Sequence, residues 1–286
     1  MGGPLVSTVP LRPVTEVRAV KVRPDRAVEL PERLATEEPL EIRAAGPAQP
    51  SEPVAVTMRT PGADFELASG FLVSEGLASA GDVAAVGYCE SAAPEHRFNT
   101  VTVSLRVPWV PPDVGRAFVA TSSCGVCGKA GIDQVELACP VVGPTPPIPA
   151  SVLADLPDKL RSAQRVFDRT GGLHAAGRFA GDGTLLCARE DVGRHNAVDK
   201  VIGERVLATA AGRPVEDGWI LMVSGRVSFE IVQKAAMARF AVIAAVSAPS
   251  SLAVAAADRL GITVAGFVRG RTYTVYSHPE RLDLSA

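Results

Sequence analysis

The second half of the chain alternates short apolar runs with helix-type patterns, and this alternation constrains the fold more than any other feature. Such runs are typical of strands in a sheet that is covered on both faces. Strands are predicted at residues 174–179, 185–188, 219–223, 241–246, 263–267 and 273–276. Helices are predicted at residues 196–207, 229–239 and 252–260, with Ser228 and Ser251 as suitable N-caps. The pattern predicts an α/β layer with a mostly parallel sheet.

The first half of the chain shows strand-type patterns and one clear helix. The strand-type runs cover residues 16–22, 40–43, 54–59, 83–89 and 100–107. Asp64 is the predicted N-cap of the helix, and Gly76 is its predicted stop. A second helix is predicted after a proline-rich stretch, with Ser151 as its cap, Phe167 on its apolar face and Gly171 at its end.

The length of 286 residues suggests about two domains. The predicted fold class is α/β (α+β overall), with a smaller, mainly antiparallel β N-terminal domain and an α/β C-terminal domain. We expect a disordered or peripheral N-terminus over residues 1–15 and the β domain over residues 16–110. A CxxC loop and proline-rich linker follow over residues 111–150, and the α/β domain covers residues 151–286.

Composition makes several function classes improbable. The net charge of −2 gives no basic field that would recruit nucleic acid or a membrane surface. The N-terminus lacks the pattern of a signal peptide, and the long uncharged run at residues 240–257 is interrupted by Pro249, so no membrane span is expected. Five cysteines do not suggest a disulfide framework, and they fit a reducing cytoplasm.

Two thiols that can share one site occur in the stretch TSSCGVCGKA. Cys124 and Cys127 are each followed by glycine, which allows tight turns and movement. Lys129 favours the thiolate, the form that attacks sulfur, binds metal or carries a persulfide. Half of a zinc knuckle is an alternative, but a second CxxC is missing. A thioredoxin-like dithiol is weaker, because glycines follow where that motif would open a helix. A mobile dithiol loop describes the stretch best.

Polar segments follow several of the predicted strands. They are residues 189–200, 224–234, 247–251 and 268–272. In open α/β sheets, ligands bind beyond the carboxyl ends of the strands. Arginine side chains and the backbone amides at helix N-termini bind phosphate, so the set would suit a large polyanion such as a nucleotide-bearing cofactor. Ordinary helix capping and surface charge pairs are the alternative explanation for each segment taken singly.

Several long motifs closely resemble the FdhD family of formate dehydrogenase accessory sulfurtransferases. They are TSSCGVCGKAG, TGGLHAAG, REDVGRHNAVDKVIG, SGRVSFEIVQKAAMA and SAPSSLAVAAADRLGITVAGFVRG. The resemblance runs in order from about Pro53 to the C-terminus. It implies a cytoplasmic sulfur carrier that takes a persulfide sulfur from a cysteine desulfurase. The carrier would pass the sulfur to the molybdenum bis(molybdopterin guanine dinucleotide) cofactor before insertion into formate dehydrogenase.

The resemblance also implies roles for individual residues. The persulfide-bearing cysteine corresponds to Cys124, with Cys127 as its partner, a second carrier or a resolving thiol. The cofactor-binding segment corresponds to Phe267, Val268, Arg269, Gly270, Arg271 and Thr272. The family resemblance further implies a homodimer and a cytidine-deaminase-like C-terminal domain without a permanently bound metal. That agrees with the absence of the H-x-E or C-x-E and P-C-x-x-C motifs of zinc deaminases from this part of the sequence.

Two other hypotheses compete with sulfur transfer. One is a non-catalytic chaperone that binds the molybdenum cofactor, in which the pocket residues matter and the thiols only assist. The other is a binding module in which Cys124 and Cys127 hold a structural zinc ion. Sulfur loading of Cys124 and metal content separate the three.

Overall fold

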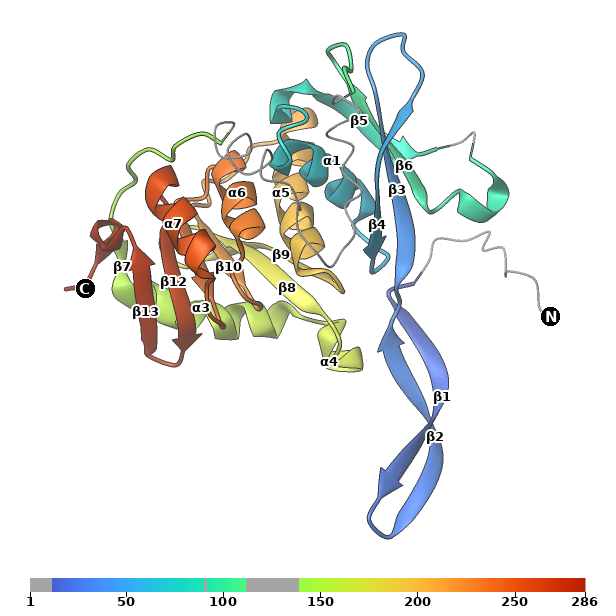
Figure 1. The fold of residues 1–286 in the computed structure, drawn as a ribbon, viewed down its shortest axis with the longest axis horizontal. Helices are drawn as coiled ribbons and strands as arrows, with labels where there is room; N and C mark the ends of the chain where they lie inside the picture. The colour runs from blue at the N-terminus through green and yellow to red at the C-terminus, as the bar shows by residue number, and fades with distance from the viewer. Residues whose placement is uncertain (1–11, 90–91, 112–138, 286) are drawn as a thin grey trace.

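The computed structural model describes residues 12–89, 92–111 and 139–285. These residues form two larger sheets with helices around them and a separate hairpin that extends away from both (Figure 1). The two sheets share one hydrophobic core. Helix α1 (Asp64–Ser74) and helix α5 (Arg194–Ala210) lie against each other where the two sheets meet.

The hairpin consists of the antiparallel strands β1 (Val14–Arg23) and β2 (Arg26–Ala35). The first strand was predicted as residues 16–22, whereas β2 was missed. Its sequence RAVELPERLA contains a proline and four charged residues, which hide the strand pattern. Proline is acceptable here because a two-stranded sheet has only edge strands.

A four-stranded sheet follows, in the order β4-β3-β6-β5. Its strands are β3 (Glu38–Ala45), β4 (Glu52–Arg59), β5 (Val83–Tyr88) and β6 (Thr100–Leu105). The outer pairs are antiparallel and the central pair, β3 with β6, is parallel. All four strands lie at or near their predicted positions, because each carries its own apolar alternation. Short 3₁₀ helices at Ala80–Asp82 and Pro94–His96 connect them.

Asp64 is not the predicted N-cap of α1 but its first residue. Ala63 takes the cap position in a left-handed conformation, with φ of 55°. The Asp64 carboxylate is unavailable for capping, because it accepts hydrogen bonds from Arg59, Tyr88 and the amide of Gly62. Gly76 does follow the end of the helix with φ of 70°, as predicted for a stop.

The second sheet has six strands in the order β13-β12-β11-β10-β8-β9. They are β8 (His174–Phe179), β9 (Leu185–Asp191), β10 (Ile220–Val223), β11 (Val242–Ala245), β12 (Thr263–Arg269) and β13 (Thr272–Ser277). The prediction of a mostly parallel sheet was wrong. Only β10–β11 and β11–β12 are parallel pairs, since β8 and β13 run against their neighbours. Tight hairpins, which apolar periodicity does not reveal, reverse the chain at both places.

Helices cover both faces of this sheet (Figure 1). Helix α3 (Ala150–Ala163) crosses one face, and α5, α6 (Phe229–Met237) and α7 (Ser251–Leu260) lie on the other. The central strands β8, β10, β11 and β12 are buried almost throughout, whereas the edge strands β9 and β13 are only partly buried. The double cover explains why the central strands are apolar rather than alternating.

Three predicted helix boundaries need correction. Helix α3 starts at Ala150 rather than after a Ser151 cap, because the short strand β7 (Ile148–Pro149) runs directly into it. Phe167 belongs to a separate short helix, α4 (Phe167–Thr170). The cap of α7 is Ser250 rather than Ser251, since the Ser250 hydroxyl accepts the amide of Ala253 at 3.2 Å.

The chain closes with a 3₁₀ helix at Pro279–Arg281 and strand β14 (Leu282–Asp283), which pairs with β7. The uncharged run at residues 240–257 divides into β11, a turn and most of α7. Among the described helices, none has the length and apolar character needed to span a membrane.

Candidate functional site

The predicted sulfur-carrying residues, Cys124 and Cys127, lie outside the described residues. The chain on both sides of that stretch is held by hydrogen bonds. Before it, the backbone of Trp109 bonds to the Gln49 side chain at 2.6 and 3.1 Å, which fixes it beside the first sheet. After it, Val142 donates its amide to the last turn of α7 at 2.9 Å. The stretch therefore connects two anchored points, one at each sheet.

The predicted polar segments do meet at one edge of the second sheet. Strands β9, β10, β11 and β12 run in the same direction, so their carboxyl ends lie together, and β8 and β13 begin there. The amide of Phe267 donates to the carbonyl of Ser247 at 3.2 Å, and Val227 pairs with Pro249. These bonds join the turns after three adjacent strands into one continuous surface.

Residues 267–272 form the tip of the β12–β13 hairpin. Arg269 pairs with Thr272, and a bulge precedes this pair. Phe267 lies in the bulge with φ of 54°, and the residue is 45% exposed. A bulky residue at positive φ is unusual, and such residues are concentrated at functional sites. Val268 is fully buried, so only its backbone can face a ligand.

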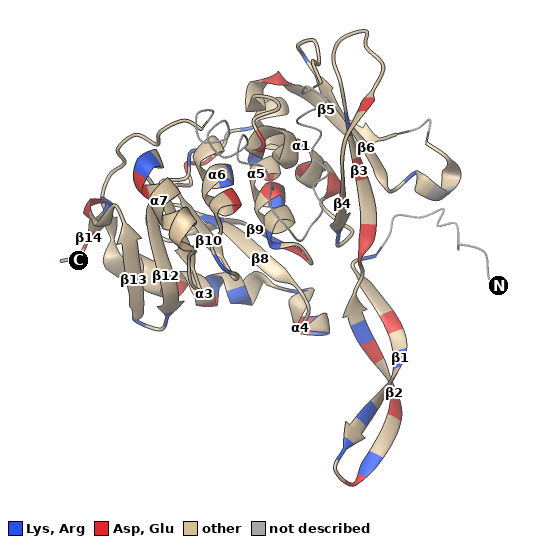
Figure 2. Ribbon diagram, in the orientation of Figure 1, with Lys and Arg blue, Asp and Glu red and all other residues tan. Residues whose placement is uncertain are grey.

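Basic residues also lie at the same hairpin tip (Figure 2). Arg269 and Arg271 are exposed, and among the described residues neither guanidinium has a hydrogen bond or ion-pair partner. Gly270 between them has φ of 53°, as a tight turn requires. The tip therefore presents one exposed aromatic ring and two free guanidinium groups, which is a combination suited to an anionic ligand with a planar ring.

Several charged residues of the 189–200 segment prove to be structural. The carboxylate of Glu190 accepts the amides of Val166 at 2.9 Å and Phe167 at 2.7 Å, and so holds the start of α4. Asp191 pairs with Lys200 at 2.7 Å, and both are buried. The alternative explanation, charge pairing, therefore holds for these residues of the segment. The sequence left it open because their partners come from distant parts of the chain.

A second buried ionic cluster joins α1, α5 and α6. Lys234 contacts Asp199 at 2.9 Å, Glu75 at 2.6 Å and the hydroxyl of Ser74 at 2.9 Å. Burial, with Glu75 nearby, raises the pKa of Asp199 to about 6 although Lys234 opposes this. Burial alone would lower the pKa of Lys234, but the two carboxylates outweigh it and the pKa is raised. Lys234 therefore stays protonated, and the cluster holds three helices together.

His195 lies between this cluster and the sheet edge. Its Nε2 is 3.2 Å from the hydroxyl of Ser228 and 3.9 Å from the carboxylate of Glu230. Burial and the charges of Lys234 and Arg194 lower the pKa of His195 to about 4. The imidazole is therefore neutral at pH 7. The predicted N-cap Ser228 does occupy the cap position of α6, but its hydroxyl bonds no helix amide.

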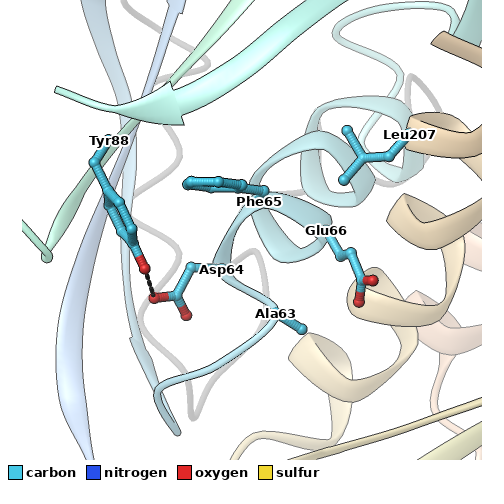
Figure 3. A pocket seen from close by; sticks show the side chains of 6 residues that line it. All are labelled: Ala63, Asp64, Phe65, Glu66, Tyr88 and Leu207. Carbon is cyan, nitrogen blue, oxygen red and sulfur yellow. Dashed lines mark hydrogen bonds between the residues drawn. The ribbon is translucent and has the colours of Figure 1, made fainter. Parts of the chain in front are cut away.

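A small cavity of about 280 Å³ opens beside the first turn of α1 (Figure 3). Tyr88 donates its hydroxyl to Asp64 at 3.0 Å, and the rings of Tyr88 and Phe65 are 4.8 Å apart. Burial raises the pKa of Tyr88, and the charge of Asp64 adds to this. Sequence reasoning missed this group. The one signal in the sequence was Arg59, a charged residue at the end of an apolar strand. In the structure Arg59 pairs with Asp64 at 3.0 Å.

The cavity offers no free charge. Asp64 is already paired with Arg59, and the Glu66 carboxylate accepts two hydrogen bonds from Arg189. Over the described parts of the chain, no three His, Cys, Asp or Glu side chains are grouped so that they could hold a metal ion. The zinc alternative depends on Cys124 and Cys127 and stays a prediction.

Comparison with known sequences gives a consistent result. Residues 35–283 match the FdhD/NarQ family. The sulfur carrier protein FdhD of Streptomyces coelicolor is 50% identical over 282 residues, covering 96% of this chain and 97% of that protein. The protein of the same name from Mycobacterium tuberculosis is 50% identical over 269 residues, covering 90% and 94%. The family match begins at the last residue of β2, so nearly all of the hairpin precedes it.

Comparison with solved structures supports the fold. The crystal structure of a candidate formate dehydrogenase accessory protein from Desulfotalea psychrophila superposes with a TM-score of 0.71 at 23% identity. The match covers 94% of this chain and 99% of that one. The mixed α/β arrangement of the two sheets therefore also occurs in an experimental structure.

Proposed function

The chain belongs to the FdhD/NarQ family, and from this premise we propose that it is a sulfur carrier that serves formate dehydrogenase. A cysteine desulfurase donates a sulfane sulfur to Cys124. The sulfur then passes to the molybdenum bis(molybdopterin guanine dinucleotide) cofactor, which is the substrate, before that cofactor enters formate dehydrogenase. The observation that carries the proposal is 50% identity, over nearly the whole chain, to proteins named as sulfur carriers.

The proposed sulfur transfer needs two thiols. The Cys124 thiolate attacks the terminal sulfur of the donor persulfide, whose S–S bond breaks and releases the donor thiolate. The Cys127 thiolate then attacks the inner sulfur of the Cys124 persulfide. Hydrosulfide leaves for the cofactor, and a Cys124–Cys127 disulfide remains, which an external thiol reduces for the next cycle. In this scheme Cys127 is the resolving thiol.

The conformation of residues 267–272 supports a role in binding the cofactor. The exposed ring of Phe267 offers a stacking surface for guanine, and aromatic stacking on bases contributes about 1–3 kcal/mol. Arg269 and Arg271 are free to bind phosphate oxygens through paired N–H groups. Val268 contributes its backbone alone, because its side chain is part of the core.

Mass spectrometry after incubation with a cysteine desulfurase and cysteine tests the proposal. We expect a reductant-sensitive gain of one sulfur on the Cys124 peptide, and none in Cys124→Ala. Cys127→Ala should load sulfur and retain it longer, since no thiol releases it. Cys187→Ala is the matched control: Cys187 is buried, and burial raises its pKa to about 11, so its loss should not affect loading.

The competing hypotheses predict other results. Formate dehydrogenase matured normally by a folded Cys124→Ala protein would exclude the carrier function. An unloaded wild-type protein that still binds the cofactor, with the desulfurase shown to be active, would support the chaperone alternative. One zinc ion per chain would support the binding module.

A further inference from the structure

The β1–β2 hairpin extends away from the rest of the protein, and the proposed sulfur transfer does not use it (Figure 1). The two strands pair with each other and with no other described strand. Helix α4 is the main neighbour of the hairpin, and it approaches β2 rather than β1. A two-stranded hairpin is marginally stable by itself in water, so pairing with a further strand would stabilise it.

The hydrogen bonds of the hairpin show which backbone groups of β1 are free. The amide of Thr36 donates to the carbonyl of Pro13 at 3.0 Å, so these two residues form a hydrogen-bonded pair. Bonded and non-bonded pairs alternate along an antiparallel ladder, and the register of β1 with β2 is unbroken. The even-numbered residues of β1 therefore point their N–H and C=O groups away from β2. They are Val14, Glu16, Arg18, Val20 and Val22.

The two edges of the hairpin differ in their ability to accept another strand. By the same alternation, Pro31 occupies the middle one of the outward-pointing positions of β2. Proline has no N–H to donate, and in natural proteins it protects edge strands from further pairing. Strand β1 contains no proline between Val14 and Arg23. The open edge of the hairpin is therefore the edge of β1.

The charges of β1 indicate the chemistry of a partner. The strand carries three basic residues, Arg18, Lys21 and Arg23, and one acidic residue, Glu16. Among the described residues, the side chains of Lys21 and Arg23 form no hydrogen bond or ion pair. Arg18 lies 3.5 Å from Glu29, but both side chains are exposed, and exposed pairs contribute little. The open edge thus carries positive charge that the fold does not neutralise.

We propose that β1 binds an extended, acidic segment of a partner protein as a third strand of the hairpin. Backbone hydrogen bonds from the outward-pointing positions provide affinity, and pairs of side chains provide specificity. Val20 and Val22 are 62% and 77% exposed and would pack against apolar residues of the incoming strand. Carboxylates of that strand would neutralise the basic residues. A second copy of β1 would instead bring like net charges together, which disfavours pairing between two hairpins.

Isothermal titration of the full chain with two capped peptides of about eight residues tests the charge selection. One peptide alternates valine with glutamate, and the control peptide alternates valine with lysine. We expect the acidic peptide to bind, and to bind less tightly as salt is added, whereas the basic peptide should not bind. Lys21→Glu should weaken binding of the acidic peptide about threefold to tenfold, because an attractive pair becomes a repulsive one.

Two proline variants test which edge is used. Val22 and Ala27 face each other in a non-bonded pair, so a proline at either position removes no hydrogen bond between β1 and β2. Val22→Pro removes an outward-pointing N–H from β1 and should weaken the acidic peptide about tenfold. Ala27→Pro is the matched control, because it makes the same change on the edge that Pro31 already closes, and it should leave binding unchanged.

Three results would overturn the proposal. A wild-type protein that does not bind the acidic peptide at low salt, or that binds both peptides equally, would exclude an acidic partner strand. Equal weakening by Val22→Pro and Ala27→Pro would exclude pairing at the edge of β1. Analytical ultracentrifugation addresses the second copy. A wild-type dimer that Val22→Pro converts to monomers would assign this edge to another copy of the chain. Lys21→Glu changes an exposed side chain, so it decides the matter even if a proline variant fails to fold.

Discussion

His195 is kept neutral by the groups around it. Burial and the charges of Lys234 and Arg194 lower its pKa to about 4, against the weaker pull of Glu230 and Glu75. In the unfolded chain His195 has its ordinary pKa of about 6.5, so between pH 6.5 and pH 4 the unfolded state binds a proton that the folded state does not. Proton binding therefore favours the unfolded state in this pH range. The stability that His195 contributes is complete above pH 6.5, and it is lost as the pH falls from 6.5 towards 4.

At the scale of the residue, we therefore predict a pH-dependent difference between the wild type and His195→Gln. Between pH 7 and pH 5 the wild type should lose about 1–2 kcal/mol more unfolding free energy than the variant. Asp199 acts in the opposite sense, since its raised pKa of about 6 adds stability as the pH falls, but both proteins share that contribution. Urea unfolding at the two pH values measures the difference. Equal losses in the two proteins would contradict the prediction.

Helices α1 and α5 approach each other through glycines. A Cβ on Gly203 of α5 would lie 1.8 Å from the carbonyl oxygen of Glu66. A Cβ on Gly70 of α1 would lie 1.8 Å from the carbonyl oxygen of Asp199. The backbones are thus in direct contact, which no side chain except hydrogen allows. This contact joins the helix of the first sheet to the helix of the second.

At the scale of the element, Gly203→Ala should lower the unfolding free energy by at least about 2 kcal/mol, through overpacking against backbone. Intrinsic helix propensity alone predicts the opposite sign, a gain of about 1 kcal/mol. Thr209→Ala provides the control, because Thr209 is an exposed residue of the same helix and its replacement should be nearly neutral. Denaturant unfolding measures both. A stabilised Gly203→Ala protein would refute the close contact.

Buried polar contacts connect the two sheets beyond the helix pair. Lys200 donates to the carbonyl of Thr60 at 2.9 Å, and the amide of Thr60 donates to Asp191 at 3.1 Å. Asn196 donates to the carbonyl of Met58 at 2.7 Å. Separating the sheets would leave these groups without partners, at a cost of about 1–3 kcal/mol for each group that stays buried. The two sheets should therefore unfold together.

At the scale of the whole molecule, the two tryptophans test this coupling. Trp109 lies beside the first sheet and Trp219 immediately precedes β10 of the second. The Trp219→Phe protein keeps Trp109 and reports on the first sheet, and the Trp109→Phe protein keeps Trp219 and reports on the second sheet. We expect fluorescence unfolding curves in urea that coincide with each other and with circular dichroism. Two separated midpoints would show that the sheets unfold independently.

Local pattern predicted the elements better than their arrangement. Strands such as β6 and β11 were found because their apolar sequences are sufficient to identify them. The opposite directions of β8 and β13 depend on hairpins rather than on hydropathy. The sequence also predicted polar residues at the strand ends. It could not distinguish residues that are free to bind a ligand from residues that are paired within the fold. Asp191 and Arg194 are three residues apart, and among the described residues only Asp191 has a side-chain hydrogen bond to the other sheet, from the amide of Thr60.

The glycine contact between α1 and α5 also has a consequence for synthesis of the chain. Gly70 leaves the ribosome roughly 130 residues before Gly203. At about 5–20 residues per second, α1 therefore waits several seconds or more for the helix that covers it. During that time its apolar face is exposed, and Ser74 and Glu75 lack the lysine that they bind in the finished fold. The nascent first half thus displays for that time apolar residues of α1 that the finished fold buries, and exposed surface of this kind promotes aggregation.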